Sequence, residues 1–260
     1  MHYHLFCGRI PFSDRFYYFL LWFYPSREAA SQIIIDIHVH TAEFSVGDSY
    51  LRIEDAIRRA KAVGLDGVCF TDHESIGVYE IAADLSRRYD FLVIPGIEIL
   101  TFEGDLLVFG LDEVPQAKMH ARELISHVRA HEGIAISAHP FRDNGRGMGH
   151  HLPFIDDPLG IEVLNGRTRE IHNLQAYKMA LRLGYPCLGG SDAHTVHEVG
   201  SFATRFRRKV LNLEDFISHI RNGEVSPVAL KNGRYVSLQN HIIRRPVMHE
   251  PLSQTAFCMN

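Results

Sequence analysis

Short apolar runs alternate with amphipathic segments through most of the chain. The runs are rich in isoleucine, valine, leucine and phenylalanine, and they cover residues 33–40, 66–73, 91–100, 105–111, 133–140, 160–166 and 185–194. Segments with apolar residues at helical spacing cover residues 53–64, 78–89, 117–133, 173–184 and 213–223. Most of these segments end at a glycine, which is typical of a helix C-terminus. The alternation predicts an α/β fold in which parallel strands and crossover helices close, or nearly close, into a barrel.

Two end regions fall outside this alternation. Residues 1–32 contain the aromatic run FYYFLLWFY, and we expect an extension outside the domain, with a secretory signal peptide as the alternative. Residues 241–260 are expected to form a loosely ordered tail. The sequence therefore predicts one domain, residues 33–240, which is long enough to bury a sizeable core.

Charge and cysteine usage restrict the partners and the compartment. The formal net charge of the 260 residues is −4, which provides no long-range attraction to nucleic acid or to an anionic membrane. We therefore expect no membrane contact, infer no protein partner, and expect local cations to hold any anionic substrate. The four cysteines are scattered and show no C-x-x-C spacing. This pattern is typical of reduced thiols in a cytoplasmic protein.

Ionisable side chains close five of the seven apolar runs. They are His38, His40, Asp72, His73, Glu98, His139, Asp192 and His194. In a parallel barrel the carboxyl ends of the strands meet at one face, where such folds carry their active sites. A single histidine after an apolar run is more often a hydrogen-bonded rim residue than a ligand, but burying this many ionisable groups without a cation is costly. Imidazoles and carboxylates together suit zinc, manganese or iron, so the sequence predicts a metal site.

Five short motifs in this region resemble one known family. They are D-x-H-x-H-T at 36–41, T-D-H at 71–73, G-I-E at 96–98, A-H-P at 138–140 and S-D-A-H at 191–194. In this order they resemble the PHP family, the polymerase and histidinol phosphatase domain, over about residues 33–210. The resemblance implies a distorted TIM-like barrel of seven strands and helices. It also implies two or three divalent ions, zinc, manganese or iron, and hydrolysis of phosphoesters.

The resemblance also assigns ligands. It places His38, His40, Glu98 and Asp192 around one ion, and Glu98 would bridge to a second ion held also by His139. It gives a third ion to His73 and His194, with Asp48 as the candidate from the loop after His40. Asp72 would either ligate or orient His73. Leu107 stands where many family members have a further histidine ligand, which leads to the hypothesis of two tightly bound ions rather than three.

Phosphoryl transfer mainly requires positioning and charge neutralisation, so it needs no serine or cysteine nucleophile. The candidates for protonating the leaving group are Asp72 and His194. Arg142 and Arg167 follow motifs of the predicted active-site face and are the candidates for binding substrate phosphate, with a solvated loop arginine as the alternative for each. Arg146 and Asn165 are weaker candidates. The glycine-rich segment 139–151 is flexible enough to act as a lid.

We therefore interpret the chain as a metal-dependent phosphoesterase that acts on small phosphomonoesters or nucleotides. Only about forty residues separate Glu98 from His139, which leaves little room for an insertion that would enlarge the pocket. Three alternatives stay open. They are a 5′–3′ exonuclease on short oligonucleotides, a non-catalytic metal-stabilised binding module, and amide hydrolysis of the kind catalysed by H-x-H amidohydrolases.

Overall fold

The computed structural model describes residues 32–45, 47–155 and 160–238. The proposed N-terminal extension, apart from Gln32, and the proposed C-terminal tail lie outside this part of the chain. The described strands are β1 (Ile33–Val39), β2 (Gly67–Phe70), β3 (Leu92–Pro95), β4 (Ile97–Leu100), β5 (Asp105–Phe109), β6 (Ile134–Ser137), β7 (Gly160–Asn165), β8 (Cys187–Gly190), β9 (Phe202–Phe206), β10 (Val225–Lys231) and β11 (Arg234–Ser237). The described helices are α2 (Ile53–Ala62), α3 (Ala82–Tyr89), α4 (Ala121–Ala130), the 3-10 helix η1 (Gly149–Phe154), α5 (Glu170–Leu183) and α6 (Leu213–Arg221).

The strands form two mixed sheets. One sheet has the order β11-β10-β9-β1-β2-β3, and the other has the order β4-β5-β6-β7-β8. The pairs among β1, β2 and β3 and among β6, β7 and β8 are parallel, as the alternation predicted. The α/β class is therefore confirmed. The described strands form no closed barrel, and closure stays a prediction. Two isolated bridges join the two sheets, Val39 with Ala193 and His73 with Glu98.

The run at residues 91–100 is two strands rather than one, because the chain changes sheets at Gly96. β3 is the edge strand of the first sheet, whereas β4 pairs antiparallel with β5 in the second. A Cβ atom at position 96 would lie 2.5 Å from the ring of Phe109 and 3.0 Å from the side chain of Thr71. Only glycine fits at this crossing. The crossing sets Glu98 beside His73 of the neighbouring sheet.

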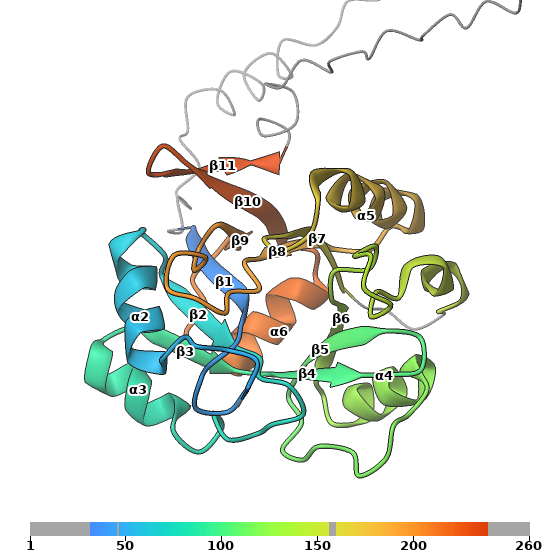
Figure 1. The fold of residues 1–260 in the computed structure, drawn as a ribbon, viewed down its shortest axis with the longest axis horizontal. Helices are drawn as coiled ribbons and strands as arrows, with labels where there is room; N and C mark the ends of the chain where they lie inside the picture. The colour runs from blue at the N-terminus through green and yellow to red at the C-terminus, as the bar shows by residue number, and fades with distance from the viewer. Residues whose placement is uncertain (1–31, 46, 156–159, 239–260) are drawn as a thin grey trace, which may run out of the picture.

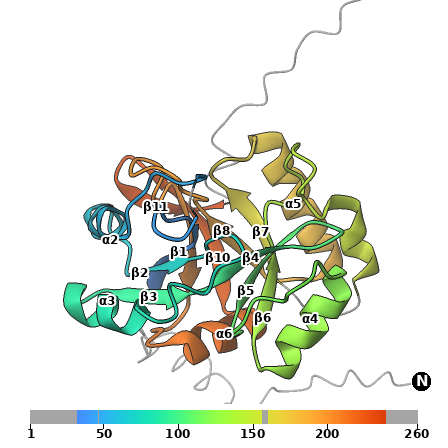
Figure 2. The ribbon, with the colours of Figure 1, turned by 60° about the horizontal axis from the view of Figure 1, so that its bottom comes forward.

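Apolar packing fixes the positions of the helices. Figure 1 shows α2 and α3 beside the first sheet and α4 and α5 beside the second, and Figure 2 shows the helices outside the strands. Helix α6 differs, because its Phe216 and Ile220 join an apolar cluster with Ile35, Leu107 and Phe109 from the strands. The side chains named in this cluster are buried in the interior of the domain. No helix in the described part of the chain is long and apolar enough to cross a membrane.

Three antiparallel strands near the end of the domain were not predicted. β9 pairs with β1 and β10, and β10 forms a hairpin with β11. The turn of this hairpin carries Asn232 and Gly233, both with positive φ. An Asn-Gly pair between apolar runs is a strong hairpin signal that the alternation of longer elements had obscured. The predicted helix at 117–133 is also shorter, because the backbone N–H of His120 is capped by the carboxylate of Glu123 and α4 begins at Ala121.

Candidate metal centre

The two histidines at the end of β1 face one point in the interior. Both side chains are fully buried, and their Nε2 atoms lie 3.0 Å apart. The Oε2 atom of Glu98 lies 3.3 Å from Nε2 of His38 and 3.1 Å from Nε2 of His40. The Oδ1 atom of Asp192 lies 3.6 and 3.4 Å from the same two nitrogens. His38, His40 and Glu98 therefore form one metal-type group, and Asp192 joins His38 and His139 in another group that shares His38.

A second group shares Glu98. Its Oε1 atom lies 3.0 Å from Nε2 of His139, and the Oδ2 atom of Asp105 lies 3.8 Å from that nitrogen. Asp105 was missed in the sequence because it begins a strand rather than ending one. Since β5 runs antiparallel to β4, its first residue lies at the edge where the parallel strands end. Leu107 stands where many family members have a further histidine ligand, and its side chain packs into the interior apolar cluster.

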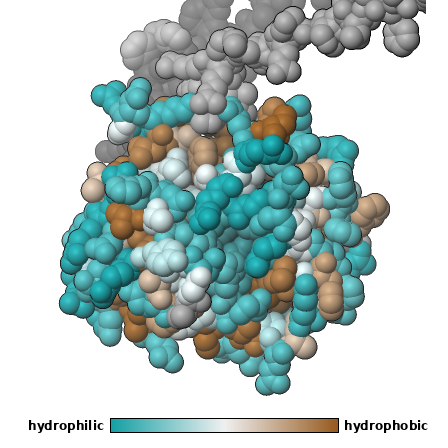
Figure 3. Space-filling view, viewed as in Figure 1, coloured by the Kyte–Doolittle hydropathy of each residue, from teal (hydrophilic) through white to brown (hydrophobic). Residues whose placement is uncertain are grey.

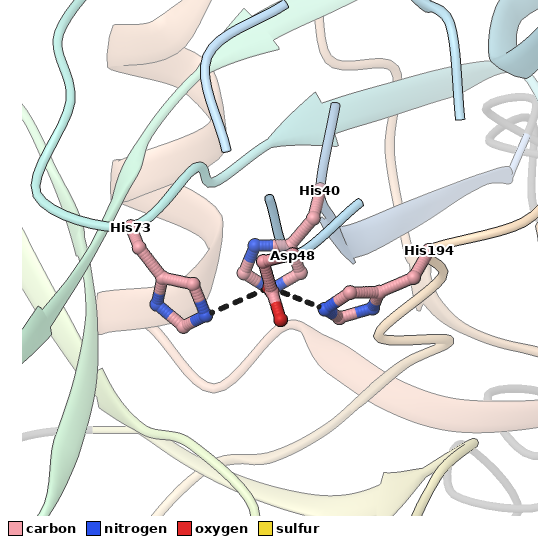
Figure 4. Close-up of side chains that lie close together, drawn as sticks. All are labelled: His40, Asp48, His73 and His194. Carbon is pink, nitrogen blue, oxygen red and sulfur yellow. Dashed lines mark hydrogen bonds and ion pairs between the residues drawn. The ribbon is translucent and has the colours of Figure 1, made fainter. Parts of the chain in front are cut away.

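A third group opens towards solvent. The Oδ2 atom of Asp48 lies 2.8 Å from Nε2 of His194 and 3.3 Å from Nε2 of His73, with the His40 ring beside both histidines (Figure 4). The side chain of Asp48 is 48% exposed, whereas the ligand candidates of the other groups are buried. The loop after His40 therefore supplies an acidic residue to this group, as expected. The molecular face drawn in Figure 3 is mainly hydrophilic, with separate small apolar patches.

The pKa values show how the buried charges balance. Burial disfavours the imidazolium of His38, yet the surrounding carboxylates, Asp192 most strongly, raise its pKa well above the usual value. Burial opposes the charge of His40 too, but hydrogen bonds to Asp192 and Glu98 raise its pKa to about 9. Burial alone would raise the pKa of Asp192, but the charge of His38 lowers it well below its usual range. Ionised carboxylates thus surround imidazoles that hold protons, and a divalent cation would replace those protons.

The histidines of the open group behave differently. Burial lowers the pKa of His73 to about 4, and the charges of His40 and Arg146 act in the same direction against the opposing charge of Glu98. Burial and the charge of His40 also lower the pKa of His194. Both imidazoles are therefore neutral near pH 7, which is the form that binds a metal ion.

Two further observations fit these residues to metal ions. The Nδ1 atom of His139 is buried and has no hydrogen-bond partner among the described residues. His139 and Asp192 also have positive φ, 29° and 54°, which costs backbone energy for residues other than glycine. Such strain persists where the surrounding structure imposes it, and it is frequent at functional sites. The donor set, the unpaired nitrogen and the strained backbone all suit bound divalent cations.

Glu162 contacts two candidate ligands, and the sequence did not predict this role. This fully buried residue of β7 places Oε1 3.0 Å from Nδ1 of His38. Its Oε2 atom accepts hydrogen bonds from the backbone N–H of His139 at 2.8 Å and from the side chain of Asn165 at 3.0 Å. A single glutamate thus orients two candidate ligands. The sequence feature that could have indicated this role is a single acidic residue inside the apolar run at 160–166.

Asp72 does not join any of the metal-type groups. Its carboxylate accepts hydrogen bonds from the backbone N–H of Thr41 at 2.6 Å, the Thr41 hydroxyl at 2.9 Å and the Ser45 hydroxyl at 2.7 Å. Ser45 in turn lies 3.4 Å from Nδ1 of His40. These contacts fix the loop after β1. The structure therefore places Asp72 behind His40, and its role as a proton donor to a leaving group stays a prediction.

His194, the second candidate acid, has both ring nitrogens engaged. Its Nδ1 atom lies 2.9 Å from the backbone oxygen of Asp192, and its Nε2 atom lies against Asp48. The carboxylate of Glu198 accepts a hydrogen bond from the His194 backbone N–H at 2.8 Å. Sequence reasoning had left the role of Glu198 open. These contacts fix the orientation of the His194 ring, and its role as a proton donor to a leaving group stays a prediction.

Three arginines surround the metal-type groups. Arg142 donates to Asp192 and, at 2.6 Å, to Asn165. Arg146 forms two hydrogen bonds to Asp105, at 2.6 and 3.0 Å. Arg167 is exposed and makes no side-chain ion pair with a described residue, although its charge contributes to the low pKa of His194. Arg142 and Arg146 therefore neutralise carboxylates of the centre, whereas Arg167 is free to meet a substrate.

Comparisons with family models and with curated proteins agree with these motifs. The model described as "PHP domain" matches residues 36–130, and the model described as "PHP-associated" matches residues 170–225. An uncharacterized protein of Methanocaldococcus jannaschii is 27% identical over 158 residues, which are 57% of this chain and 92% of that protein.

Comparison with solved structures extends the likeness to the fold. A Bifidobacterium adolescentis protein, described provisionally as a metal-dependent phosphoesterase, superposes with a TM-score of 0.53 at 17% identity, covering 62% of this chain and 87% of that one. The lesion-specific endonuclease Q of Pyrococcus furiosus superposes with a TM-score of 0.57 at 18% identity, covering 74% of this chain and 56% of that one. At these identities the likeness concerns the fold alone.

Proposed function

Because this chain belongs to the family of PHP domains, we propose that it is a metal-dependent phosphoesterase that hydrolyses small phosphomonoesters or nucleotides. The observation that carries the proposal is the buried group of His38, His40 and Glu98, with Asp192 within 3.6 Å of both histidines and Arg142 paired to Asp192. A buried set of imidazoles and carboxylates suits divalent cations, and cations next to guanidinium groups suit an anionic phosphoester. In this proposal the domain comprises residues 33–240, and its two sheets form the distorted barrel of the family.

The three groups of side chains divide the ligands between ions. His38, His40, Glu98 and Asp192 would hold one ion, and Glu98, Asp105 and His139 would hold another. The open group of Asp48, His73 and His194 would complete the centre, with zinc, manganese or iron as the candidate metals. When bound, such ions would polarise a phosphoryl group and lower the pKa of a coordinated water molecule.

The protein's own side chains would hold the substrate and the ligands in place. The planar guanidinium of Arg167 matches the oxygens of a phosphate group and stands exposed beside the open group. Glu162 fixes the ring of His38 through Nδ1 and leaves Nε2 directed at the centre. Asp72 holds the loop after β1 through Thr41 and Ser45. Binding and orientation of this kind account for most of the catalysis required in phosphoryl transfer.

Phosphate release from a substrate panel tests the proposal. Manganese-loaded protein should release phosphate from sugar phosphates or nucleoside monophosphates, and His38→Ala should abolish both turnover and metal content. His131→Ala is a matched control, because His131 is exposed and directly follows α4, on the side where β6 begins. Full turnover and full metal content in His38→Ala would overturn the assignment of this ion.

The same panel separates the other activities. Release of mononucleotides from 5′-phosphorylated oligonucleotides, without hydrolysis of any small monoester, would favour the exonuclease alternative. Ammonia release from amides would favour amide hydrolysis. Metal binding without turnover of any substrate in the panel would contradict a hydrolase and favour a metal-stabilised binding module.

A further inference from the structure

Tyr50 is the most exposed large apolar side chain in the described part of the chain. Its side chain is 84% exposed, whereas the neighbouring Ser49 and Leu51 are buried. The tyrosine ring makes no hydrogen bond or ring contact with any described residue. Tyr50 follows Asp48 of the open group by two positions. Packing of the domain therefore does not explain an aromatic ring at this place.

The main chain around Tyr50 is fixed to the metal centre. Its backbone N–H donates a hydrogen bond to the backbone oxygen of His194 at 3.1 Å. The hydroxyl of Ser49 donates to the backbone oxygen of His40 at 2.9 Å. The backbone oxygen of Leu51 accepts a hydrogen bond from Ala42 at 2.8 Å. The ring is therefore free, but it is mounted on a segment that is hydrogen-bonded to two candidate ligand residues.

Tyr50 lies on the solvent-facing side of the segment that also carries Asp48. Both residues are exposed, whereas Ser49 and Leu51 are buried. The carboxylate of Asp48 contacts His73 and His194 at the solvent-facing side of the centre. The exposed ring of Tyr50 is therefore attached two residues from Asp48, close to the opening of the metal centre.

We propose that Tyr50 is a substrate-binding residue on which the base of a nucleoside 5′-phosphate stacks while the phosphate lies at the metal centre. This inference rests on the proposed function and selects nucleotides among its substrates. An exposed aromatic ring offers a stacking face that accepts any base, since every base presents a π face. Tyrosine also has few side-chain torsions to immobilise. A mononucleotide and the 5′ end of an oligonucleotide share this chemistry.

A paired binding experiment isolates the base. Hydrolysis-resistant phosphonate analogues of AMP and of ribose 5-phosphate are titrated into the manganese-loaded full chain by calorimetry. Tyr50→Ala should weaken binding of the AMP analogue by about 5- to 150-fold, which corresponds to one stacked base, and should leave the ribose 5-phosphate analogue unchanged. Tyr50→Phe should bind like the wild type. Leu211→Ala removes another exposed apolar side chain, near the starts of β1 and β3, and should change neither affinity.

The outcomes separate stacking from hydrolysis. Equal losses for the two analogues in Tyr50→Ala, or no loss for either, would overturn the stacking role. A wild type that binds the AMP analogue no better than the ribose analogue would overturn it as well. Tyr50-dependent binding without phosphate release from any substrate would retain the stacking role and contradict the proposed hydrolase. With Tyr50 dependence present, tighter binding of a 5′-phosphorylated hexanucleotide than of the AMP analogue identifies an oligonucleotide as the source, and equal binding identifies a mononucleotide.

Discussion

The Oε1 atom of Glu162 lies 3.0 Å from the Nδ1 atom of His38, and both side chains are fully buried. This contact determines which nitrogen of the ring is available to an ion, because Nδ1 is engaged and Nε2 faces Glu98 and His40. Carboxylates in this relation to a ligating histidine fix the ring orientation and raise its basicity. In the proposed metal centre, Glu162 would therefore act through His38 and would not itself bind an ion.

Glu162→Gln should weaken metal binding by roughly 10- to 100-fold. The amide keeps the size of the side chain, and its oxygen can still accept from the backbone N–H of His139 and from Asn165. Its NH2 group then faces Nδ1 of His38 and favours the tautomer that carries the proton on Nε2, the nitrogen directed at the ion. Competition with a chelator of known affinity measures the loss. Glu214→Gln, an exposed change in the first turn of α6, is the matched control and should bind metal like the wild type. Equal metal affinity in the two variants would remove Glu162 from the centre.

Gly190→Ala should reduce both stability and metal content. A Cβ atom at this position would lie 2.6 Å from the Cβ of His38 and 2.7 Å from Oε1 of Glu162. Overpacking of this kind costs about 1–3 kcal/mol and would displace the histidine. Urea unfolding and elemental analysis report the two effects. Gly223→Ala is the control, because its φ of 66° strains alanine while no atom lies in the way, so it should lose stability and keep its metal. Full metal content in Gly190→Ala would contradict the prediction.

Asp105→Asn should lower the metal content by about one ion per chain, since the group with Glu98 and His139 loses a carboxylate ligand. Arg146→Ala is the companion variant. It removes the guanidinium that binds both oxygens of Asp105 and should leave the metal content unchanged or higher. Elemental analysis of protein purified without chelator gives the count. An unchanged count in Asp105→Asn would assign this aspartate to Arg146 alone. A wild-type count of two ions per chain would favour the hypothesis of two ions, and a count of three would contradict it.

Arg167→Ala and Arg142→Ala should have different effects. Arg167 is exposed, so its loss should lower kcat/KM for a phosphomonoester by about ten- to a hundredfold through lost charge-assisted hydrogen bonds, with metal affinity unchanged. Arg167→Lys should recover only part of this, because lysine lacks the planar fork. Arg142 binds Asp192, so Arg142→Ala should tighten metal binding on the order of tenfold. Steady-state kinetics and chelator competition separate the two roles. Identical profiles for the two alanine variants would contradict the distinction.

Cys187 should react slowly with alkylating reagents in the folded protein. Burial raises the pKa of its thiol to about 11. The reactive thiolate is therefore about a hundredfold scarcer at pH 8 than for an ordinary thiol of pKa near 9. Because the folded state holds this proton more tightly, its contribution to stability is complete below pH 9 and is lost as the pH rises from 9 to 11. Iodoacetamide labelling with peptide mapping, with and without urea, measures the difference. Equal rates in the two conditions at pH 8 would refute the shift.

The periodicity of the sequence predicts those parts of the centre that lie at the ends of parallel strands. His38, His40, His139 and Asp192 end or directly follow buried runs, and the runs themselves are readable because strands buried on both faces are continuously apolar. The sequence also predicted the loop residue Asp48, which lies in one of the metal-type groups although the loop is longer than the family pattern. Local pattern and known motif thus suffice where an element contributes its last residue.

The rest of the centre depends on pairings that no local pattern specifies. Asp105 reaches the centre because β5 runs antiparallel to β4. The residues of a strand do not by themselves determine in which direction it runs in the sheet. Glu162 touches His38 across 124 positions of chain. Asp72 follows an apolar run, as the candidate ligands do, but its carboxylate accepts hydrogen bonds from Thr41 and Ser45. Tertiary contacts, and not residue type alone, determine which carboxylates lie among the candidate metal ligands.

The junction between the two sheets has a consequence for how the chain folds. Backbone pairing between the sheets is limited to isolated bridges among the described residues, while the candidate ligands come from both sides, with His40 on one and Asp105 on the other. The centre is therefore dominated by contacts of high sequence separation, which form late in folding. An ion bound there would be retained mainly by chains whose sheets have already docked. High-affinity metal uptake would then mark the last stage of folding, and a partly folded chain would hold neither the ion nor the activity that depends on it.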